Sequence, residues 1–484
     1  MSEDTKEENS DKHEEFQETD PLKDNIEDPT GEKQRSFTEN CVHAFKNITV
    51  EPSMFFFIIP MIFSILTSQN LNLEKACRVN LNFTDEICDS LKMQTVGAQN
   101  EYEKEVQKLV ARAMSWRTSI TATIPCVLAL FVGSWSDKTG YRKIFLIIPI
   151  LGQLLVCANG IFHTFYFKEI GLEAAITNEK NRTFRMGLIN FSLTVGFPIG
   201  MGLSGLLLKK LGYYGCYFLA FGLHFVNLTY NTFILKDPER TVEQKKNDNQ
   251  GVRHLVRIFF DLGNLRDTIK VVFKNGSNHR RFRVCALLVV VAILFGPMHG
   301  ELSIMYISTR YRFNWTEVMF SIFQAYNFVA HTIGTIFSIV VFSKYLQWHD
   351  SLLGIISTLS KIASSFVYCF ATNEKIFFIA PLVDILNGTA LLALRSTVSK
   401  TVAADEFGKV NSIFALTENL MPLIYVPLYT KVYTVTMEVL PGAVFLMGSA
   451  MTLPAVCVFI WLLWEHRRNL RISKENPEGT ADIK

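Results

Sequence analysis

The apolar residues of this chain are gathered in long blocks that are hydrophobic on every side, instead of following the 3.6- or 2-residue period of half-buried elements. Each block approaches the roughly 20 residues that a helix needs to cross a bilayer. Because backbone amides in lipid must be satisfied within their own segment, the blocks are predicted to be helices. We count eleven such spans, near residues 53–69, 117–135, 144–163, 186–207, 213–235, 282–306, 319–342, 351–371, 376–394, 408–430 and 440–464.

Three polar segments divide the chain into two groups of spans. Residues 1–50 are acidic and almost free of large apolar side chains, which predicts a disordered cytosolic tail. The basic segment 236–281 separates an N-terminal helical bundle, 51–235, from a C-terminal bundle of similar size, 282–464. Residues 465–484 are predicted to form a second cytosolic tail. The pattern therefore predicts an all-α polytopic membrane protein built from two related helical bundles.

The distribution of Lys and Arg predicts which loops face the cytosol. The link 136–143, the segment 236–281 and the C-terminal tail are basic, so we place them in the cytosol. The loops 70–116 and 307–318 then face outside. The formal net charge of +3 indicates no particular partner, and we expect no nucleic-acid binding.

The two predicted outer loops carry features of an oxidising, glycosylating compartment. The acceptor patterns NFT at Asn82 and NWT at Asn314 lie there, one in each loop. Cys77 and Cys88 lie in the first loop, where two cysteines commonly pair as a disulfide.

The count of spans conflicts with this orientation. The cytosolic segments 136–143 and 236–281 must be separated by an even number of spans, but only three lie between them. The stretch after the third span is rich in charged residues and cannot cross lipid as it stands. Either a span is absent from this chain or a half-buried segment enters and leaves the membrane.

The link between the second and third spans reads GSWSDKTGYRK and has more structure than a polar loop requires. Gly133 permits close helix approach, and Gly140 permits a tight reversal. Asp137 can pair with a cation or cap a facing helix, and Arg142 holds the link in the cytosol. Such a set can latch two helices in one conformation and release them in another. The alternative is an ordinary basic cytosolic loop.

This link resembles the signature of the major facilitator superfamily. Further stretches are similar to solute carrier family 46, the proton-coupled folate transporter family, and the chain resembles an arthropod member of it. Among these stretches are EPSMFFFIIPMIF, TDEICDSL, RTFRMGLIN, FGPMHGELSIMY and LALRSTVSKTVAADEFGKVNSIFAL. The resemblance covers roughly residues 50–465 and implies twelve spans. The family comparison places the missing fourth span between about Glu173 and Thr177, so eleven spans are expected in this chain.

Ionisable groups within spans are functional candidates because they are costly to bury in lipid. His299 and Glu301 follow Pro297 in GPMHGE, where the proline and glycines are expected to free backbone groups toward a cavity. The resemblance implies a proton-sensitive histidine at His299, and a neighbouring carboxylate favours the protonated form. The alternative is a polar residue near the outer mouth without a coupling role. His331, by contrast, is predicted to be a satisfied core histidine.

Three further ionisable residues lie in or at the end of later spans. Asp384 lies three residues from Asn387, on one face of the tenth span. Arg395 ends that span, and the family has a functional arginine there, suited to binding an anion in two-point fashion. Snorkelling of Arg395 to the cytosolic surface is the alternative. Glu418 is predicted to face the central cavity or to pair with a cation such as Lys361 or Arg395.

The chain departs from the folate transporter at two positions. Asn190 stands where that transporter has a proton-coupling glutamate, and Tyr141 replaces the first arginine of its link motif. These two departures weaken the inference, from the resemblance alone, of folate as the substrate and of that scheme of proton coupling.

The leading hypothesis is a proton-coupled secondary transporter of a small organic anion, working by alternating access. The resemblance suggests folates, peptidoglycan fragments or cyclic dinucleotides as substrates, in the plasma membrane or an endolysosomal membrane. The alternative is a non-transporting membrane protein or an inert splice product that lacks span 4. A membrane enzyme is the weakest hypothesis, because no metal-binding spacing, nucleophile elbow or phosphate-binding loop is found. No cofactor is expected, and the expected partners are the substrate, protons and the lipid bilayer.

Overall fold

The regular elements of the protein are helices throughout the part of the chain that the structure describes. The computed structural model describes residues 51–95, 97, 99–139, 141, 143–167, 184–235, 262–276, 279–403 and 406–475. The N-terminal bundle contains α2 (Glu51–Lys75), the π-helix η1 (Ala76–Asn80), α3 (Asp85–Lys92), α4 (Glu101–Thr139), α5 (Ile144–Phe165) and α6 (Phe184–Phe233). The segment between the bundles contains α9 (Leu262–Val272). The C-terminal bundle contains α10 (Arg280–Phe313), α11 (Glu317–Phe337), the π-helix η3 (Ser338–Tyr345), α12 (Asp350–Phe370), α13 (Glu374–Val383), α14 (Gly388–Thr401), α15 (Phe407–Thr436) and α16 (Ala443–Glu475).

Many of these helices are long and apolar enough to cross a membrane. By length and composition, seven helices within the described ranges qualify. The other predicted spans lie in α4, α6 and α15, and α6 is divided by Gly212, whose backbone is not helical (φ 65°, ψ −173°). This division falls between the two predicted spans 186–207 and 213–235. The predicted position of the missing fourth span, near residues 173–177, lies outside the described residues.

Three boundaries differ from the sequence-based expectation. Helix α4 begins at Glu101, well inside the predicted outer loop 70–116, and α10 continues to Phe313 instead of ending near residue 306. Polar and charged side chains can extend a membrane helix beyond the lipid, and hydropathy alone does not detect this extension. The predicted span 376–394 is broken into α13 and α14, with turns at residues 384–387.

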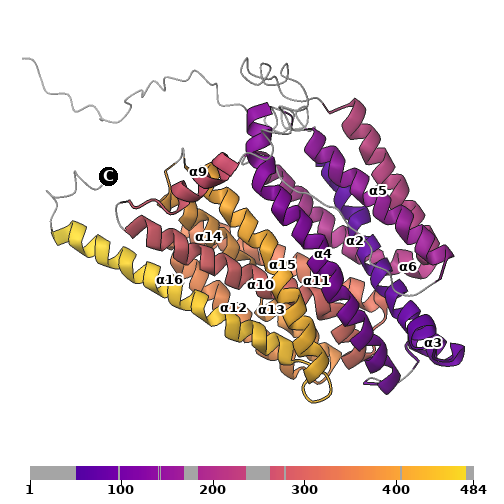
Figure 1. Cartoon of the computed structure of the whole chain (residues 1–484). Coiled ribbons are helices and arrows are strands. Elements are labelled where there is room, and N and C mark those ends of the chain that lie inside the picture. Colours follow the sequence, from indigo (N-terminus) through magenta and orange to yellow (C-terminus); the bar gives the residue numbers. More distant parts are fainter. Residues whose placement is uncertain are drawn as a thin grey trace, which may run out of the picture. The chain divides into compact units, whose positions relative to one another are not determined.

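Packing within each bundle and between the bundles positions the site. In the N-terminal bundle α6 packs on α2 and α5, and in the C-terminal bundle α10 packs on α15 and α16, while α12 packs on α14 and α16. Between the bundles, α4 packs along α15 and α6 packs along α11 (Figure 1). A large core of buried apolar residues continues across the α4–α15 contact, with Val106 and Val110 on one side and Tyr429 and Tyr433 on the other.

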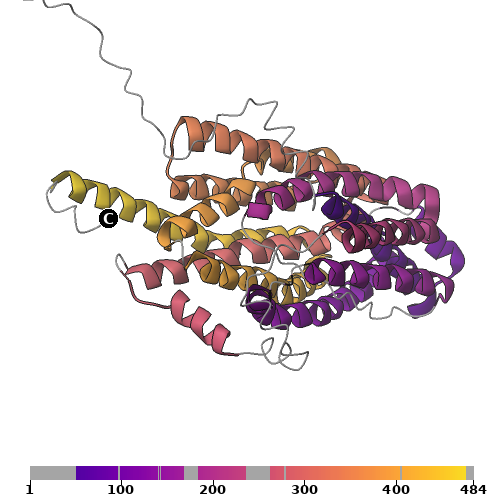
Figure 2. The same ribbon diagram turned by 90° about the horizontal axis from the view of Figure 1, so that it is seen from above.

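The two ends of the helices carry different surfaces. Figure 1 shows α3 at one end and α9 at the other. The last turns of α16 extend past the neighbouring helices at the α9 end, as both ribbon views show (Figures 1 and 2). These turns carry the basic sequence EHRRNLR. Helix α9, from the basic segment between the predicted bundles, and the basic end of α16 therefore share one end, and α3 of the cysteine-containing loop lies at the other.

Candidate functional site

A cluster of charged side chains lies inside the C-terminal bundle. Lys361 on α12 places its Nζ 2.6 Å from Oε2 of Glu301 on α10. The same Nζ lies 3.8 Å from Oδ2 of Asp384, which follows the last residue of α13. His331 on α11 adds its Nε2 at 3.6 Å from that Oδ2. Four side chains from four consecutive predicted spans thus meet around one ammonium group.

The cluster holds more negative than positive charge and is shielded from solvent. Glu301 and Asp384 are only 4% and 2% exposed. With His331 neutral, the two carboxylates and one ammonium carry a net charge of −1. Oε1 of Glu301 and Oδ1 of Asp384 are buried without a hydrogen-bond partner among the described residues. Because an unpaired charge is costly to bury, a proton bound to one of the two carboxylates would stabilise the cluster.

The break between α13 and α14 places Asp384 in the cluster. Gly334 on α11 permits close approach, because a Cβ there would lie 1.9 Å from the carbonyl oxygen of Ile385. Serines of α12 bind the backbone groups that the break frees. Ser357 Oγ donates to the carbonyl of Leu386 at 2.6 Å and accepts the N–H of Ala390 at 2.9 Å. Irregular backbone within a membrane is tolerated where neighbouring helices satisfy it in this way.

The tyrosine and glycine beside Glu301 close the cluster on the remaining side. The hydroxyl of Tyr429 on α15 is buried without a partner among the described residues. A Cβ at Gly448 on α16 would lie 2.5 Å from Oε1 of Glu301 and 2.6 Å from that hydroxyl. Only glycine at this position leaves the carboxylate its place.

The two histidines occupy positions different from those expected. His299 and Glu301 are two residues apart on α10, so their side chains point about 200° apart around the helix. His299 is half-buried, its ring stacks on Phe295 with centroids 6.4 Å apart, and no ion pair joins it to Glu301 within the described ranges. His331, expected to be a satisfied core residue, instead lies at the charged cluster with Nε2 lacking a hydrogen bond there.

Arg395 and Glu418 form a second, separate pair. Nη2 of Arg395 lies 3.5 Å from Oε1 of Glu418, which selects Arg395 over Lys361 as the partner of Glu418. The pair lines a cavity of about 140 Å³ between α10, α14 and α15. The Arg395 side chain is 47% exposed, so the guanidinium can reach both the cavity and water.

The link motif is only partly described. Gly133 and Asp137 lie in the last turns of α4, whereas Gly140 and Arg142 lie outside the described residues. Asn190 lies on α6. The latch predicted for this link therefore stays a prediction.

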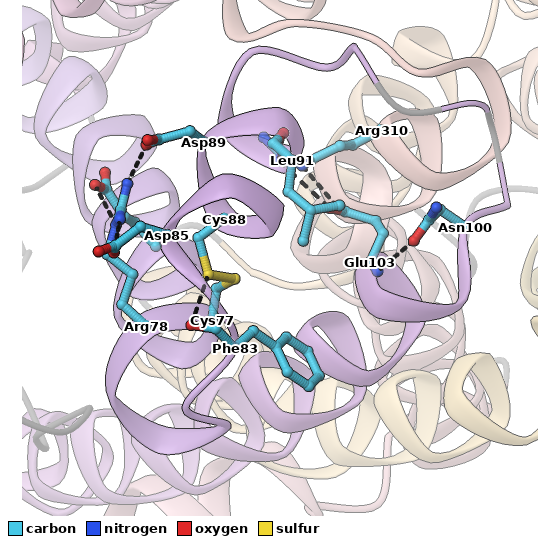
Figure 3. The surroundings of a disulfide bond; sticks show 11 residues. Cys77, Arg78, Phe83, Asp85, Cys88, Asp89, Leu91, Asn100, Glu103 and Arg310 are labelled. Atoms are coloured by element: carbon cyan, nitrogen blue, oxygen red, sulfur yellow. Dashed lines mark hydrogen bonds and ion pairs between the residues drawn. A yellow bond between two sulfur atoms is a disulfide. The ribbon is translucent and has the colours of Figure 1, made fainter.

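The loop 70–116, predicted to face outside, is cross-linked by a disulfide close to the end of α10. Cys77 and Cys88 are disulfide-bonded, with their Cα atoms 5.8 Å apart (Figure 3). Arg78 forms ion pairs with Asp85 and Asp89 of α3. These contacts fold the loop after α2 back on itself and place α3 beside the first turn of α4.

The two predicted glycosylation sites differ in accessibility. Asn82 is exposed, whereas Asn314 is half-buried and its Nδ2 donates to the carbonyl of Gln94 at 2.6 Å. A glycan on Nδ2 of Asn314 would have to break this hydrogen bond and fit at a half-buried position. We expect Asn82→Gln to increase electrophoretic mobility to that of the glycosidase-treated protein, whereas Asn314→Gln leaves mobility unchanged. A mobility shift for Asn314→Gln alone would contradict this assignment.

Comparison with known proteins identifies the fold and family. The model of the Major Facilitator Superfamily matches residues 170–426, more than half of the 484 residues. The mouse lysosomal proton-coupled steroid conjugate and bile acid symporter of solute carrier family 46 is 25% identical over 82% of this chain and 89% of its own. The chain belongs to the major facilitator superfamily.

Other relatives and a solved structure agree with this assignment. A probable peptidoglycan muropeptide transporter of Drosophila melanogaster, also in family 46, is 22% identical over 87% of this chain and 86% of its own. The rat proton-coupled folate transporter is 21% identical over 73% of this chain and 80% of its own. The crystal structure of the human organic anion transporter MFSD10 shares the fold, with a TM-score of 0.55 at 13% identity over 85% of this chain and 99% of its own. Membership of the major facilitator superfamily, predicted from the link motif, is confirmed, as is the all-α membrane fold, and these relatives agree with the resemblance to solute carrier family 46.

For a member of this superfamily, the sequence reasoning missed one central residue. Lys361 was considered only as a partner for Glu418, although it binds Glu301 and approaches Asp384. Its isolation within a polar but uncharged stretch, STLSKIASS, was the available signal. A lysine in mid-span requires a carboxylate partner, and Glu301 and Asp384 were both candidates.

The family comparison makes the protein an integral, multi-pass secondary transporter and not an enzyme.

Proposed function

We propose that this protein couples the uptake of a small organic anion to protons through the cluster of Lys361, Glu301, Asp384 and His331. The observation that supports the proposal is the excess of one carboxylate over the buried ammonium, with carboxylate oxygens left without partners. In a region without water, such a site is stable when it holds one proton. Loading and release of that proton changes the attraction between Lys361 and its two carboxylates.

The coupling follows from this competition. When Glu301 is protonated, Lys361 loses its ion pair at 2.6 Å and is available to a carboxylate or sulfate of the substrate. When the substrate leaves, Lys361 attracts Glu301 again and the proton is expelled. The anion and the proton therefore move in the same direction. Arg395, in the cavity beside α10, α14 and α15, is placed to receive the anion at the end of the helices predicted to be cytosolic.

The relatives support the substrate class. The mouse relative is named for steroid conjugates and bile acids, the fly relative for muropeptides and the rat relative for folate. Most of these compounds carry carboxylates or sulfates on a bulky, partly apolar frame. We infer an anion of this kind for the present chain, carried across the plasma membrane or an endolysosomal membrane. The hypothesis of transport is favoured over that of a non-transporting product, because all four side chains of the charged cluster lie together.

The proposal is tested with the full chain in proteoliposomes. Radiolabelled bile acid conjugate, folate and muropeptide are offered with and without an imposed inward proton gradient. We expect at least one anion to accumulate above equilibrium only with the gradient, and a protonophore to abolish the accumulation. Accumulation that is insensitive to the protonophore would contradict proton coupling. Absence of uptake for every anion, in vesicles that hold correctly folded protein, would favour the non-transporting alternative.

A further inference from the structure

A second buried ion pair lies far from the charged cluster, at the end of the helices that carries the disulfide. Nε of Arg310 on α10 lies 2.6 Å from Oε1 of Glu103 in the first turn of α4 (Figure 3). Both side chains are only 5% exposed. Nη2 of Arg310 also donates to the carbonyl of Leu91 in the outer loop at 2.6 Å. The pair joins the N-terminal bundle to the C-terminal bundle.

The pair continues into a chain of hydrogen bonds that crosses between the bundles a second time. Nε2 of Gln107 on α4 donates to Oε1 of Glu103 at 2.7 Å. Oε1 of Gln107 accepts from the hydroxyl of Tyr433 on α15 at 2.8 Å. Gln107 and Tyr433 are completely buried. Side chains on one side of α4 are therefore hydrogen-bonded to both α10 and α15.

Other contacts between the bundles lie at the same end. The hydroxyl of Tyr306 on α10 donates to Oδ1 of Asn70 on α2 at 2.7 Å. The N–H of Gly205 on α6 donates to Oγ of Ser321 on α11 at 2.7 Å, and Oγ of Ser204 lies 3.2 Å from that oxygen. In this structure the bundles are thus closed against each other at the end predicted to face outside.

The charged pair differs from the neutral contacts in what its separation requires. A neutral hydrogen bond can be exchanged for water at little net cost. A buried guanidinium and carboxylate are stable only when paired or fully hydrated, so they can part only if water enters between the bundles. This end of the helices therefore has two states. In the closed state the two side chains are paired and free of water, and in the open state both are hydrated.

We propose that the Glu103–Arg310 pair is the latch of the outer gate, intact when the transport pathway is closed to the outside and broken when it opens outward. Gln107 and Tyr433 are positioning residues that hold the Glu103 carboxylate toward Arg310. This role requires the two-bundle fold but neither a particular substrate nor proton coupling, so it can fail or hold independently of the proposed function.

The charges that meet at the exposed carboxylate of Glu438, near the latch, provide a matched control. Nζ of Lys108 lies 3.1 Å from Oε1 of Glu438, and Nζ of Lys104 lies 3.3 Å from the same oxygen. The hydrogen bond from Lys108 and that from Lys104 lower the pKa of Glu438. These pairs also connect α4 with the end of α15, but water and salt reach the Glu438 carboxylate, which is 54% exposed, and screen its interactions. Lys108→Gln therefore removes a charge between the bundles without touching the buried pair.

The latch is tested by accessibility of a reporter thiol from outside. Ser204→Cys places the thiol at a completely buried contact between the bundles. Intact cells that express the full chain are treated with a membrane-impermeant maleimide, and the labelled fraction of surface protein is measured. In the Glu103→Gln background we expect the labelling rate to rise about tenfold or more, because Arg310 then lacks its counter-charge in the closed state.

Two further variants separate a latch from a general loss of stability. Tyr433→Phe removes only the hydroxyl and is expected to raise the labelling rate severalfold, with Lys108→Gln at the parent rate. Normalisation to surface protein removes any effect on abundance. An unchanged labelling rate in both Glu103→Gln and Tyr433→Phe would overturn the proposal. Labelling that appears only after permeabilisation would overturn it too, because the latch would then face the cytosol.

Discussion

Replacement of Lys361 by methionine is expected to abolish uptake. The substitution keeps an unbranched side chain, one atom shorter, but leaves Glu301 and Asp384 buried without the cation of Lys361. Removal of one partner from a buried ion pair typically costs about 3–5 kcal/mol, so the abundance of the folded protein should also fall. The measurement is uptake per molecule of surface protein, compared between Lys361→Met and the parent chain.

The control for this variant is a lysine of the same bundle whose own side chain is exposed. Lys400 binds Asp350 at 2.7 Å, and its side chain is 66% exposed. Lys400→Met should leave uptake within about twofold, since the Lys400 ammonium is exposed and Ser396 still donates a hydrogen bond to Asp350. The triple variant Lys361→Met, Glu301→Gln and Asp384→Asn should restore abundance without uptake, because it removes the unpaired charges together with the site. Recovery of uptake in the triple variant would show that the cluster is structural only.

Neutralisation of Glu301 is expected to separate substrate movement from proton movement. In Glu301→Gln the carboxylate can no longer take up or release a proton, while Lys361 keeps Asp384 at 3.8 Å as a partner. We expect accumulation driven by an inward proton gradient to be lost, whereas exchange of labelled for unlabelled substrate continues. The rise of uptake with falling external pH should disappear for the same reason. The readouts are gradient-driven uptake and counterflow in the same proteoliposomes.

A carboxylate outside the cluster gives the reference for this experiment. Glu374 lies exposed in the first turn of α13, so Glu374→Gln should retain both gradient-driven uptake and exchange. Asp384→Asn tests the second carboxylate in the same way. If Glu301→Gln and Asp384→Asn both keep their response to the proton gradient, protons are coupled elsewhere. His299, which lies on another face of α10, would then be the next residue to test.

Much of the fold could be predicted because hydropathy is a local property. The blocks of apolar residues located the helices, and the basic segments divided them into two bundles. Helix ends were less predictable, since α4 and α10 extend beyond the lipid-length blocks through residues such as Glu103 and Arg310. The break at residues 384–387 was also missed, because Gly334 and Ser357 on other helices accommodate it.

The candidate site was predictable in its members but not in its pairing. The cost of an ionisable group in lipid drew attention to Glu301, Asp384 and Glu418 without any structure. Which cation each carboxylate meets depends on the rotation and packing of whole helices. Lys361 therefore pairs with Glu301 and approaches Asp384, whereas Glu418 pairs with Arg395.

The sequence by itself determined that this is a helical membrane transporter of its superfamily, with a pair of cysteines and a few costly charges inside its spans. Those features follow from composition over single segments and from motifs of neighbouring residues. The tertiary structure alone decided that four spans join at Lys361, that His299 points away from Glu301, and that Glu103 closes on Arg310. Glu103 and Arg310 are 207 positions apart in the sequence, and only the packing of helices against one another brings such residues within bonding distance.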